Sequence, residues 1–197
     1  MAATDGSLTG ALRLYDWNAR VSSAFHEELH YVEVGLRNAM DRQLTAWSAA
    51  LGAQSSWYSD PRVPLVPPTR AKVAIARTNA TRGGQPELHG KVVAELMLGF
   101  WWSLLSDDYN RRLWQPCLRF AFDGPVRRTR LHAELDELRR LRNRIAHHEP
   151  VHGRDLEADH QRVLDVAGRI SPQLSARIEI VGRVPQVLLE RAEPPRD

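Results

Sequence analysis

The chain has 197 residues, of which 43% are hydrophobic and 26% are charged, and this balance is typical of a water-soluble globular protein with one sizeable core. A lone cysteine, Cys117, excludes an intramolecular disulfide bond, and the most apolar run, residues 92–102, contains Glu95 and is too short to span a bilayer. Because the first residues lack a basic segment followed by an apolar core, we expect no signal peptide, no membrane association and a cytoplasmic location.

The formal net charge of +3 is unevenly distributed. Residues 1–60 carry 4 basic and 7 acidic side chains, residues 61–130 carry 12 and 5, and residues 131–197 carry 11 and 12. The three segments therefore have net charges of −3, +7 and −1. The basic middle segment fits an electrostatic guide for an RNA backbone. A GC-rich genome would explain the basic residues equally well, because arginine greatly exceeds lysine: only Lys72 and Lys91 of the 27 basic residues are lysine.

Helical periodicity dominates the first half of the chain. The predicted elements here are a long helix over 11–51, a proline-rich connector over 52–68, and helices over 69–82 and 86–106. A bend is expected near residues 21–23, because an unbroken helix of this length would span about 60 Å. We interpret Trp101 and Trp102 as core or dimer contacts in preference to platforms for base stacking.

The second half is also predicted to be helical. Its predicted elements are a short helix over 107–114, a turn over 116–125, and helices over 126–148, 155–170 and 171–181. No stretch of any length shows the alternation of a strand. We therefore expect an all-α fold, with a single domain over residues 1–183 and a loosely ordered tail over residues 184–197.

The most informative side chains lie at the end of the predicted helix over 126–148. Arginine, asparagine and histidine crowd into seven residues, as Arg142, Asn143, Arg144, His147 and His148. Guanidinium groups bind phosphate through paired hydrogen bonds, an amide can orient it, and imidazole moves protons near neutral pH. Because the residue before a proline avoids the α region, we expect the helix to end near His148 or Glu149, where its dipole stabilises an imidazolium.

The motif side chains do not share one face of a straight helix. Asn143 and His147 lie together on the polar side, whereas Arg142 falls within the apolar stripe. The stripe consists of Leu131, Leu135, Leu138, Leu141 and Ile145. If the three side chains act together, Arg142 reaches round the helix, the helix end is distorted, or a second copy of the chain supplies part of the site. On the long first helix, Glu33 pairs either with Arg37, one turn away, or with Arg142.

The sequence Arg142-Asn143-x-x-x-His147 resembles the R-x4-6-H motif of the HEPN superfamily, and LRNRIAHHEP resembles its Abi-like (abortive infection) branch. Residues 31–39 are similar to the family's long first helix, and residues 95–102 and 109–114 are similar to its middle helices. The likeness extends over about residues 12–152, although this chain is shorter than many Abi-like members and we expect no second catalytic domain.

The resemblance implies a HEPN-like helical bundle with a long first helix and a C-terminal helical extension, which forms a homodimer with two motifs facing one cleft. It also implies metal-independent endoribonuclease activity without a cofactor, used in toxin–antitoxin systems or antiphage defence. The implied partners are RNA, a second copy of the chain, and an antitoxin protein or RNA. The expected products carry a 2′,3′-cyclic phosphate and a 5′-hydroxyl group.

Under this reading His147 transfers the proton, Arg142 binds the scissile phosphate, and Asn143 orients the phosphate or His147. Supporting or substrate-binding contacts are expected from Arg144, His148, Glu33 and Arg37. The family accepts both histidine spacings, so His148 remains an alternative to His147 as the proton carrier.

Three other readings of the motif stay open. One is a non-catalytic dimeric module, in which Arg142 pairs with a core carboxylate. A second is a metal site formed by His147, His148, Glu149 and His152, although their spacing fits no common helical signature. The third is a protein that binds nucleotides or RNA without cleaving them.

Overall fold

The computed structural model describes residues 8–191, so residues 1–7 of the predicted domain and residues 192–197 of the predicted tail lie outside the described residues. Within this range every regular element is a helix and no strand occurs, which confirms the all-α prediction. The α-helices are α1 (Leu8–Ala50), α2 (Pro67–Ala80), α3 (His89–Glu95), α4 (Leu98–Ser103), α5 (Arg128–Ala146), α6 (Leu156–Ile170), α7 (Pro172–Val181) and α8 (Val184–Leu189). None of the described helices has the length and apolar composition of a membrane-spanning segment.

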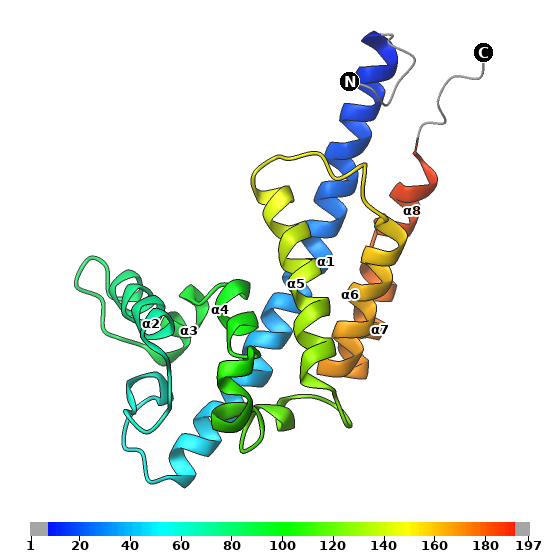
Figure 1. Ribbon diagram of the computed structural model, residues 1–197. Coiled ribbons are helices and arrows are strands. Elements are labelled where there is room, and N and C mark those ends of the chain that lie inside the picture. Colours follow the sequence, from blue (N-terminus) through cyan, green and yellow to red (C-terminus); the bar gives the residue numbers. More distant parts are fainter. Residues whose placement is uncertain (1–7, 192–197) are drawn as a thin grey trace.

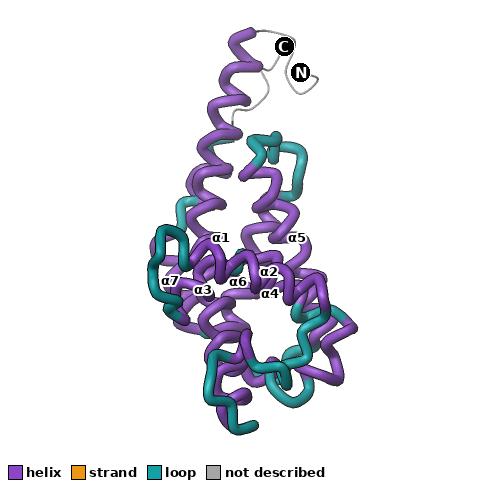
Figure 2. Tube along the Cα trace, turned by 90° about the vertical axis from the view of Figure 1, so that its left-hand side faces the viewer, coloured by secondary structure: helices purple, strands orange, loops and turns teal. Residues whose placement is uncertain are grey.

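The long helix α1 forms the axis of the fold (Figure 1). Its 43 residues contain no proline, and the helix continues through residues 21–23, where a bend was expected. At a rise of 1.5 Å per residue it is about 64 Å long. The turns before Trp17 extend beyond the other helices (Figures 1 and 2), and they expose three large apolar side chains, Leu8, Leu12 and Tyr15.

Helix α5 lies antiparallel to α1 (Figure 1). Its leucines pack into the core. Four of the predicted stripe residues are fully buried, namely Leu131, Leu135, Leu138 and Leu141. Helices α6 and α7 also pack against α1, and α7 comes close at Gly35, where a Cβ atom would lie 2.6 Å from Cδ2 of the Leu174 side chain. This packing places the C-terminus of α5 beside the first half of α1.

The predicted helix over residues 86–106 is interrupted, and α3 and α4 take its place. The backbone is extended at Leu96 and Met97, between the two helices. The Glu33 carboxylate on α1 accepts a hydrogen bond from the N–H of Leu98 at 2.8 Å, and Trp101 Nε1 donates to the Leu96 carbonyl at 2.7 Å. The break depends on a contact with α1, and apolar residues continue through it, so hydrophobic periodicity does not reveal it.

The two neighbouring tryptophans have different surroundings. Trp101 is fully buried in the core. Trp102 is half-buried against α5, where its ring stacks on His132 with 4.8 Å between centroids and lies 4.5 Å from the guanidinium carbon of Arg139. Both rings therefore serve packing within this chain.

Two further segments differ from their predicted structures. Residues 107–114 form a 3-10 turn followed by a π-helix, in place of one short α-helix. Residues 184–189 were expected in a loose tail but form α8, where Val184 is fully buried. Trp17 Nε1 on α1 donates a hydrogen bond to the Val187 carbonyl at 2.8 Å. The tail prediction is corrected for these six residues, because apolar burial and this hydrogen bond hold them against α1.

Candidate functional site

The C-terminus of α5 closes in a tight turn that carries both motif histidines. The helix ends at Ala146, slightly earlier than predicted. The N–H groups of His148 and Glu149 donate to the carbonyl oxygens of Ile145 and Arg144, at 3.1 and 2.8 Å. This pair of bonds is the Schellman arrangement, in which glycine usually stands at the position of His148.

The backbone of His148 is strained. Among the described non-glycine residues it alone has a positive φ, of 56°. A left-handed conformation costs a residue with a Cβ atom about 1 kcal/mol or more, and such strain clusters at functional sites. The turn reverses the chain, so His147 and His148 are directed to different surroundings.

A cavity of about 410 Å³ separates the first half of α1 from this turn. We call it the His148 cavity. Its walls include Asn18 and His26 from α1, and Ile145, His148 and Glu149 from the end of α5 and the turn. His148 therefore lines a cavity together with a second imidazole, which comes from a distant part of the sequence.

A second cavity, of about 230 Å³, surrounds Arg142, and we call it the Arg142 cavity. His26 lines both cavities, which are therefore adjacent. The other polar side chains of the Arg142 cavity are His30, Glu33 and Arg37. These side chains come from α1 at spacings of four, three and four residues, which is one face of a helix. Three residues singled out in the sequence, Glu33, Arg37 and Arg142, thus line one cavity.

Neither ion pair predicted for Glu33 is present. Within residues 8–191 its carboxylate pairs with neither Arg37 nor Arg142, and it caps the first turn of α4 at Leu98. Arg142 is half-buried, and its guanidinium has no hydrogen-bond or ion-pair partner in the same range. A guanidinium in this position retains its full capacity to bind an anion.

The remaining motif residues lie elsewhere. Arg144 donates through Nε and Nη2 to the Pro150 carbonyl at 3.1 and 2.7 Å, and it lies 3.6 Å from the Glu149 carboxylate, so it stabilises the turn. His147 is exposed and Asn143 is half-buried, and neither lines the two cavities. The structure thus separates Asn143 and His147 from Arg142, as their positions on a straight helix predicted.

The loop after α5 is anchored on both sides. Asn18 on α1 accepts hydrogen bonds from the N–H groups of Val151 and His152 at 2.8 and 3.1 Å. Arg154 donates to both oxygens of the buried Asp159 carboxylate at 2.7 and 3.0 Å, and these contacts raise the pKa of Arg154. Because the loop is tied to α1 and α6, the wall of the His148 cavity is held in place.

Sequence reasoning missed Asn18, His26 and His30. The two histidines share the helical face of Glu33 and Arg37, and this spacing is visible in the sequence. The sequence signal that could have located them is this spacing, which places four polar side chains on one face of α1. Asn18 gave no such signal, since its partners lie more than 130 residues away.

The arrangement provides an unpaired guanidinium and three imidazoles along adjacent cavities, a set suited to a phosphodiester. The described residues contain no group of three or more His, Cys, Asp or Glu side chains placed to hold a metal ion, so His147, His148, Glu149 and His152 form no such cluster. Comparisons of the chain with protein-family models, curated proteins and solved structures find no match.

Proposed function

We propose that this protein is a homodimeric, metal-independent endoribonuclease of the HEPN type, with Arg142 on the scissile phosphate and a motif histidine as the acid or base. One observation carries the proposal. The half-buried Arg142 guanidinium has no partner within residues 8–191 and lines a cavity beside His26 and His30. An arginine side chain that faces a cavity without a counter-ion keeps its donors available for an anionic group such as a phosphate.

The chemistry follows from these groups. The ribose 2′-oxygen attacks the adjacent phosphorus while an imidazole accepts the 2′-hydroxyl proton. The bond from phosphorus to the 5′-oxygen then breaks, and an imidazolium donates the proton that this oxygen needs. Arg142 stabilises the added negative charge of the phosphorane. The products carry a 2′,3′-cyclic phosphate and a 5′-hydroxyl group, so the reaction consumes no oxidant, cofactor or metal ion.

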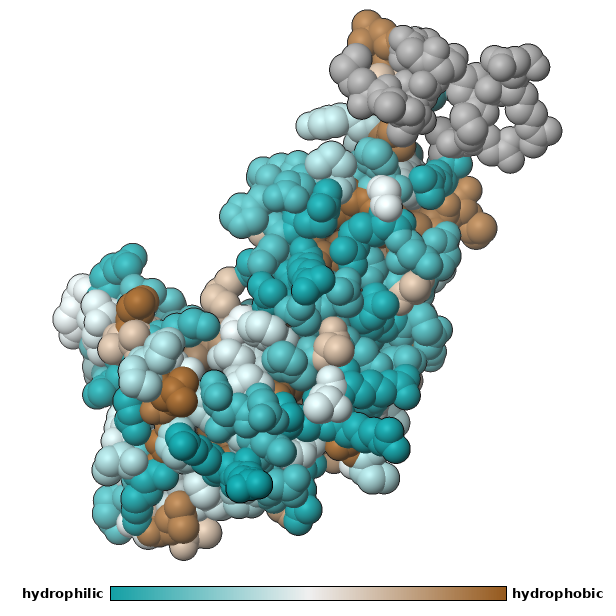
Figure 3. Space-filling model, in the orientation of Figure 1, coloured by the Kyte–Doolittle hydropathy of each residue, from teal (hydrophilic) through white to brown (hydrophobic). Residues whose placement is uncertain are grey.

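Dimerisation is supported by the exposed end of α1. Leu8, Leu12 and Tyr15 are 76%, 54% and 72% exposed, and their spacing puts them on one face. Hydrophobic surface is visible at this end of α1 in the space-filling view (Figure 3). Tyr15 also lines the His148 cavity, so a second copy docked on this face would lie beside the motif turn. The replacement Leu12→Glu is expected to yield a monomer by light scattering.

The decisive experiment is cleavage of a 5′-labelled single-stranded RNA in the presence of a chelator. We expect wild-type protein to produce cyclic-phosphate ends and Arg142→Ala to lose about a hundredfold in rate. Arg140→Ala is the matched control, because Arg140 lies on the same helix in surface ion pairs with Asp136 and Glu137. Cleavage that requires a divalent metal, or an Arg142→Ala protein as active as the control, would contradict the proposal.

The identity of the proton carrier is tested by a second pair of variants. His147 was assigned this role by the sequence motif, whereas His148 lines a cavity within the subunit. If His147 acts across a dimer, His147→Ala will lose about a hundredfold in rate and His148→Ala will lose little. If His148 acts within the subunit, the order will reverse.

The biological role proposed here is that of a toxin or abortive-infection effector acting on cytoplasmic RNA and restrained by an antitoxin protein or RNA. Expression of wild-type protein should then arrest growth, and Arg142→Ala should relieve the arrest at equal protein levels. Equal growth with both proteins would contradict the role while leaving cleavage in vitro unaffected.

A non-catalytic dimerisation or RNA-binding module is the second candidate. The observation that favours it is the separation of His147 and Asn143 from the two cavities of the subunit. This function predicts that wild-type protein and the Arg142 and histidine variants leave RNA intact alike, with any difference confined to binding.

A further inference from the structure

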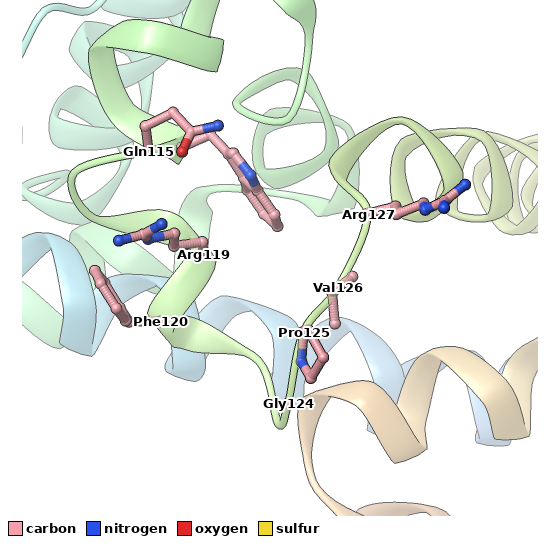
Figure 4. Close-up of a pocket in the computed structure, with 8 residues that line it drawn as sticks. Gln115, Arg119, Phe120, Gly124, Pro125, Val126 and Arg127 are labelled. Carbon is pink, nitrogen blue, oxygen red and sulfur yellow. The ribbon is translucent and has the colours of Figure 1, made fainter.

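A third cavity is shown in Figure 4. Its lining includes Val126 and Arg127, which directly precede α5, so it lies at the opposite end of this helix from the motif turn. It has a volume of about 680 Å³. Arg119 and Phe120 lie on one side of it, and Val126 and Arg127 lie on the other (Figure 4). Along α5, Arg142 lies 14 residues after Arg128, which is about 21 Å, so this cavity is distinct from the two cavities of the proposed cleavage site. We call it the Phe120 cavity.

The segment around this cavity is strongly basic. Residues 110–127 contain four arginines, and Asp123 is the single acidic residue among them. The arginines are Arg111, Arg112, Arg119 and Arg127. All four are exposed, and within residues 8–191 none of their side chains has a hydrogen-bond or ion-pair partner. By contrast Arg128 and Arg130, at the start of α5, pair with Asp107 and Glu134. Arg119 and Arg127 line the cavity, and their unpaired guanidinium groups give it a positive surface that attracts phosphate.

An aromatic side chain stands within this positive surface. Phe120 is 57% exposed, and the guanidinium carbon of Arg119 lies 4.6 Å from the centre of its ring. The opposite face of such a ring is suited to stacking against a planar group, and nucleic-acid bases stack on aromatic rings without regard to sequence. The cavity therefore offers guanidinium groups for phosphate and an aromatic ring for a planar base.

The backbone leading into the cavity is unusual as well. Residues Asn110–Trp114 form a π-helix, closed by a hydrogen bond of 3.0 Å from the Gln115 N–H to the Asn110 carbonyl. π-Helical turns are rare and occur frequently at functional sites. This one carries Arg111 and Arg112 and leads directly into Gln115, which lines the cavity.

We propose that the Phe120 cavity and its arginines bind single-stranded RNA, with phosphates on the guanidinium groups and an unpaired base on Phe120. An acidic peptide would satisfy the arginines and leave the ring without a planar partner. A nucleoside monophosphate has one phosphate for the two guanidinium groups that line the cavity on opposite sides (Figure 4). The site goes beyond the proposed cleavage function, because it holds the strand at a distance from Arg142 and needs no chemistry there.

The test is fluorescence anisotropy with a labelled 2′-O-methyl oligonucleotide of about 12 nucleotides, a length that a single-strand site can hold. This probe lacks the attacking 2′-hydroxyl, so binding is measured without cleavage. We expect Phe120→Ala to weaken binding about tenfold and Phe120→Trp to retain it. The double variant Arg119→Ala/Arg127→Ala should lower the slope of log affinity against log salt by about 1.4. Arg130→Ala is the matched control and should bind like wild type.

Several results would overturn the proposal. One is that Phe120→Ala and the double arginine variant are both folded, as judged by thermal melting, and bind the oligonucleotide like wild type. A mononucleotide or a duplex of the same length that binds as tightly as the single strand would refute it too, as would displacement of the strand by an equally charged acidic peptide. The two proposals fail separately. A wild-type protein that cleaves no RNA but still binds the oligonucleotide through Phe120 would contradict the nuclease proposal alone, and a Phe120→Ala protein that binds like an active wild type would contradict this proposal alone.

Discussion

The side-chain oxygen of Asn18 lies 2.8 Å from the backbone nitrogen of Val151 and joins two segments that are 133 residues apart. The same oxygen accepts a bond from the His152 N–H at 3.1 Å. One amide on α1 therefore fixes the loop that follows the motif turn, and Asn18 also lines the His148 cavity. The shape of the candidate site depends on this link.

Removing the Asn18 side chain should loosen the turn. Asn18→Ala leaves two partly buried N–H groups without an acceptor, so we expect it to lower the free energy of unfolding by about 1–3 kcal/mol. Asn18→Asp keeps an acceptor oxygen and should retain most of the stability. Urea denaturation measures both. Equal losses for the two variants would mean that the hydrogen bonds do not account for the role of Asn18.

Replacement of His148 by glycine should have opposite effects on stability and on activity. Glycine adopts a φ near 56° without a steric penalty, so His148→Gly should raise the unfolding free energy by about 1 kcal/mol. The same variant should lose RNA cleavage if His148 carries the proton. His148→Ala removes the imidazole and keeps the strain, and is the control in thermal denaturation. A destabilised glycine variant would show that side-chain contacts of His148 outweigh its backbone strain.

Two glycines, one in a crowded position and one in an open position, provide a matched pair for testing helix packing. A Cβ atom on Gly182 would lie 2.5 Å from Oε1 of the buried Glu28 carboxylate and 2.7 Å from the Ile178 carbonyl, so Gly182→Ala should cost about 1–3 kcal/mol. At Gly168, inside α6, the nearest atoms are 3.8 Å away, so alanine should stabilise the helix by up to about 1 kcal/mol. Calorimetry of the two variants should give melting shifts of opposite sign.

The stacked pair of His132 and Trp102 predicts a pH dependence of stability. Burial lowers the pKa of His132 despite the nearby Asp136 carboxylate, so the folded protein binds the proton less readily than the unfolded chain. Its contribution is therefore present above the unfolded pKa of about 6.5 and is lost as the pH falls toward the lower folded value. His132→Phe keeps the stacking on Trp102 and should flatten the stability profile in this range. If the slope of unfolding free energy against pH is unchanged in His132→Phe, groups other than His132 cause the pH dependence.

Patterns confined to one element were readable in the sequence. Apolar spacing predicted the buried leucines of α5 and the long helix α1, because a helix repeats its core-facing side every 3.6 residues whatever packs against it. The same geometry placed Arg142 apart from Asn143 and His147. These properties depend on neighbours within a few turns, which the chain order contains directly.

Contacts between distant elements were decided only by the tertiary structure. The break between α3 and α4 depends on Glu33, the ordering of residues 184–189 depends on Trp17, and the motif turn depends on Asn18. Each of these is a hydrogen bond between α1 and a segment far along the chain. Helix propensity depends only on residues nearby in the chain and not on a hydrogen-bond partner far away. Periodicity could therefore locate the helices but not the polar contacts that join them. The placement of Arg142 in a cavity with His26 and His30 was settled in the same way, by the packing of α5 on α1.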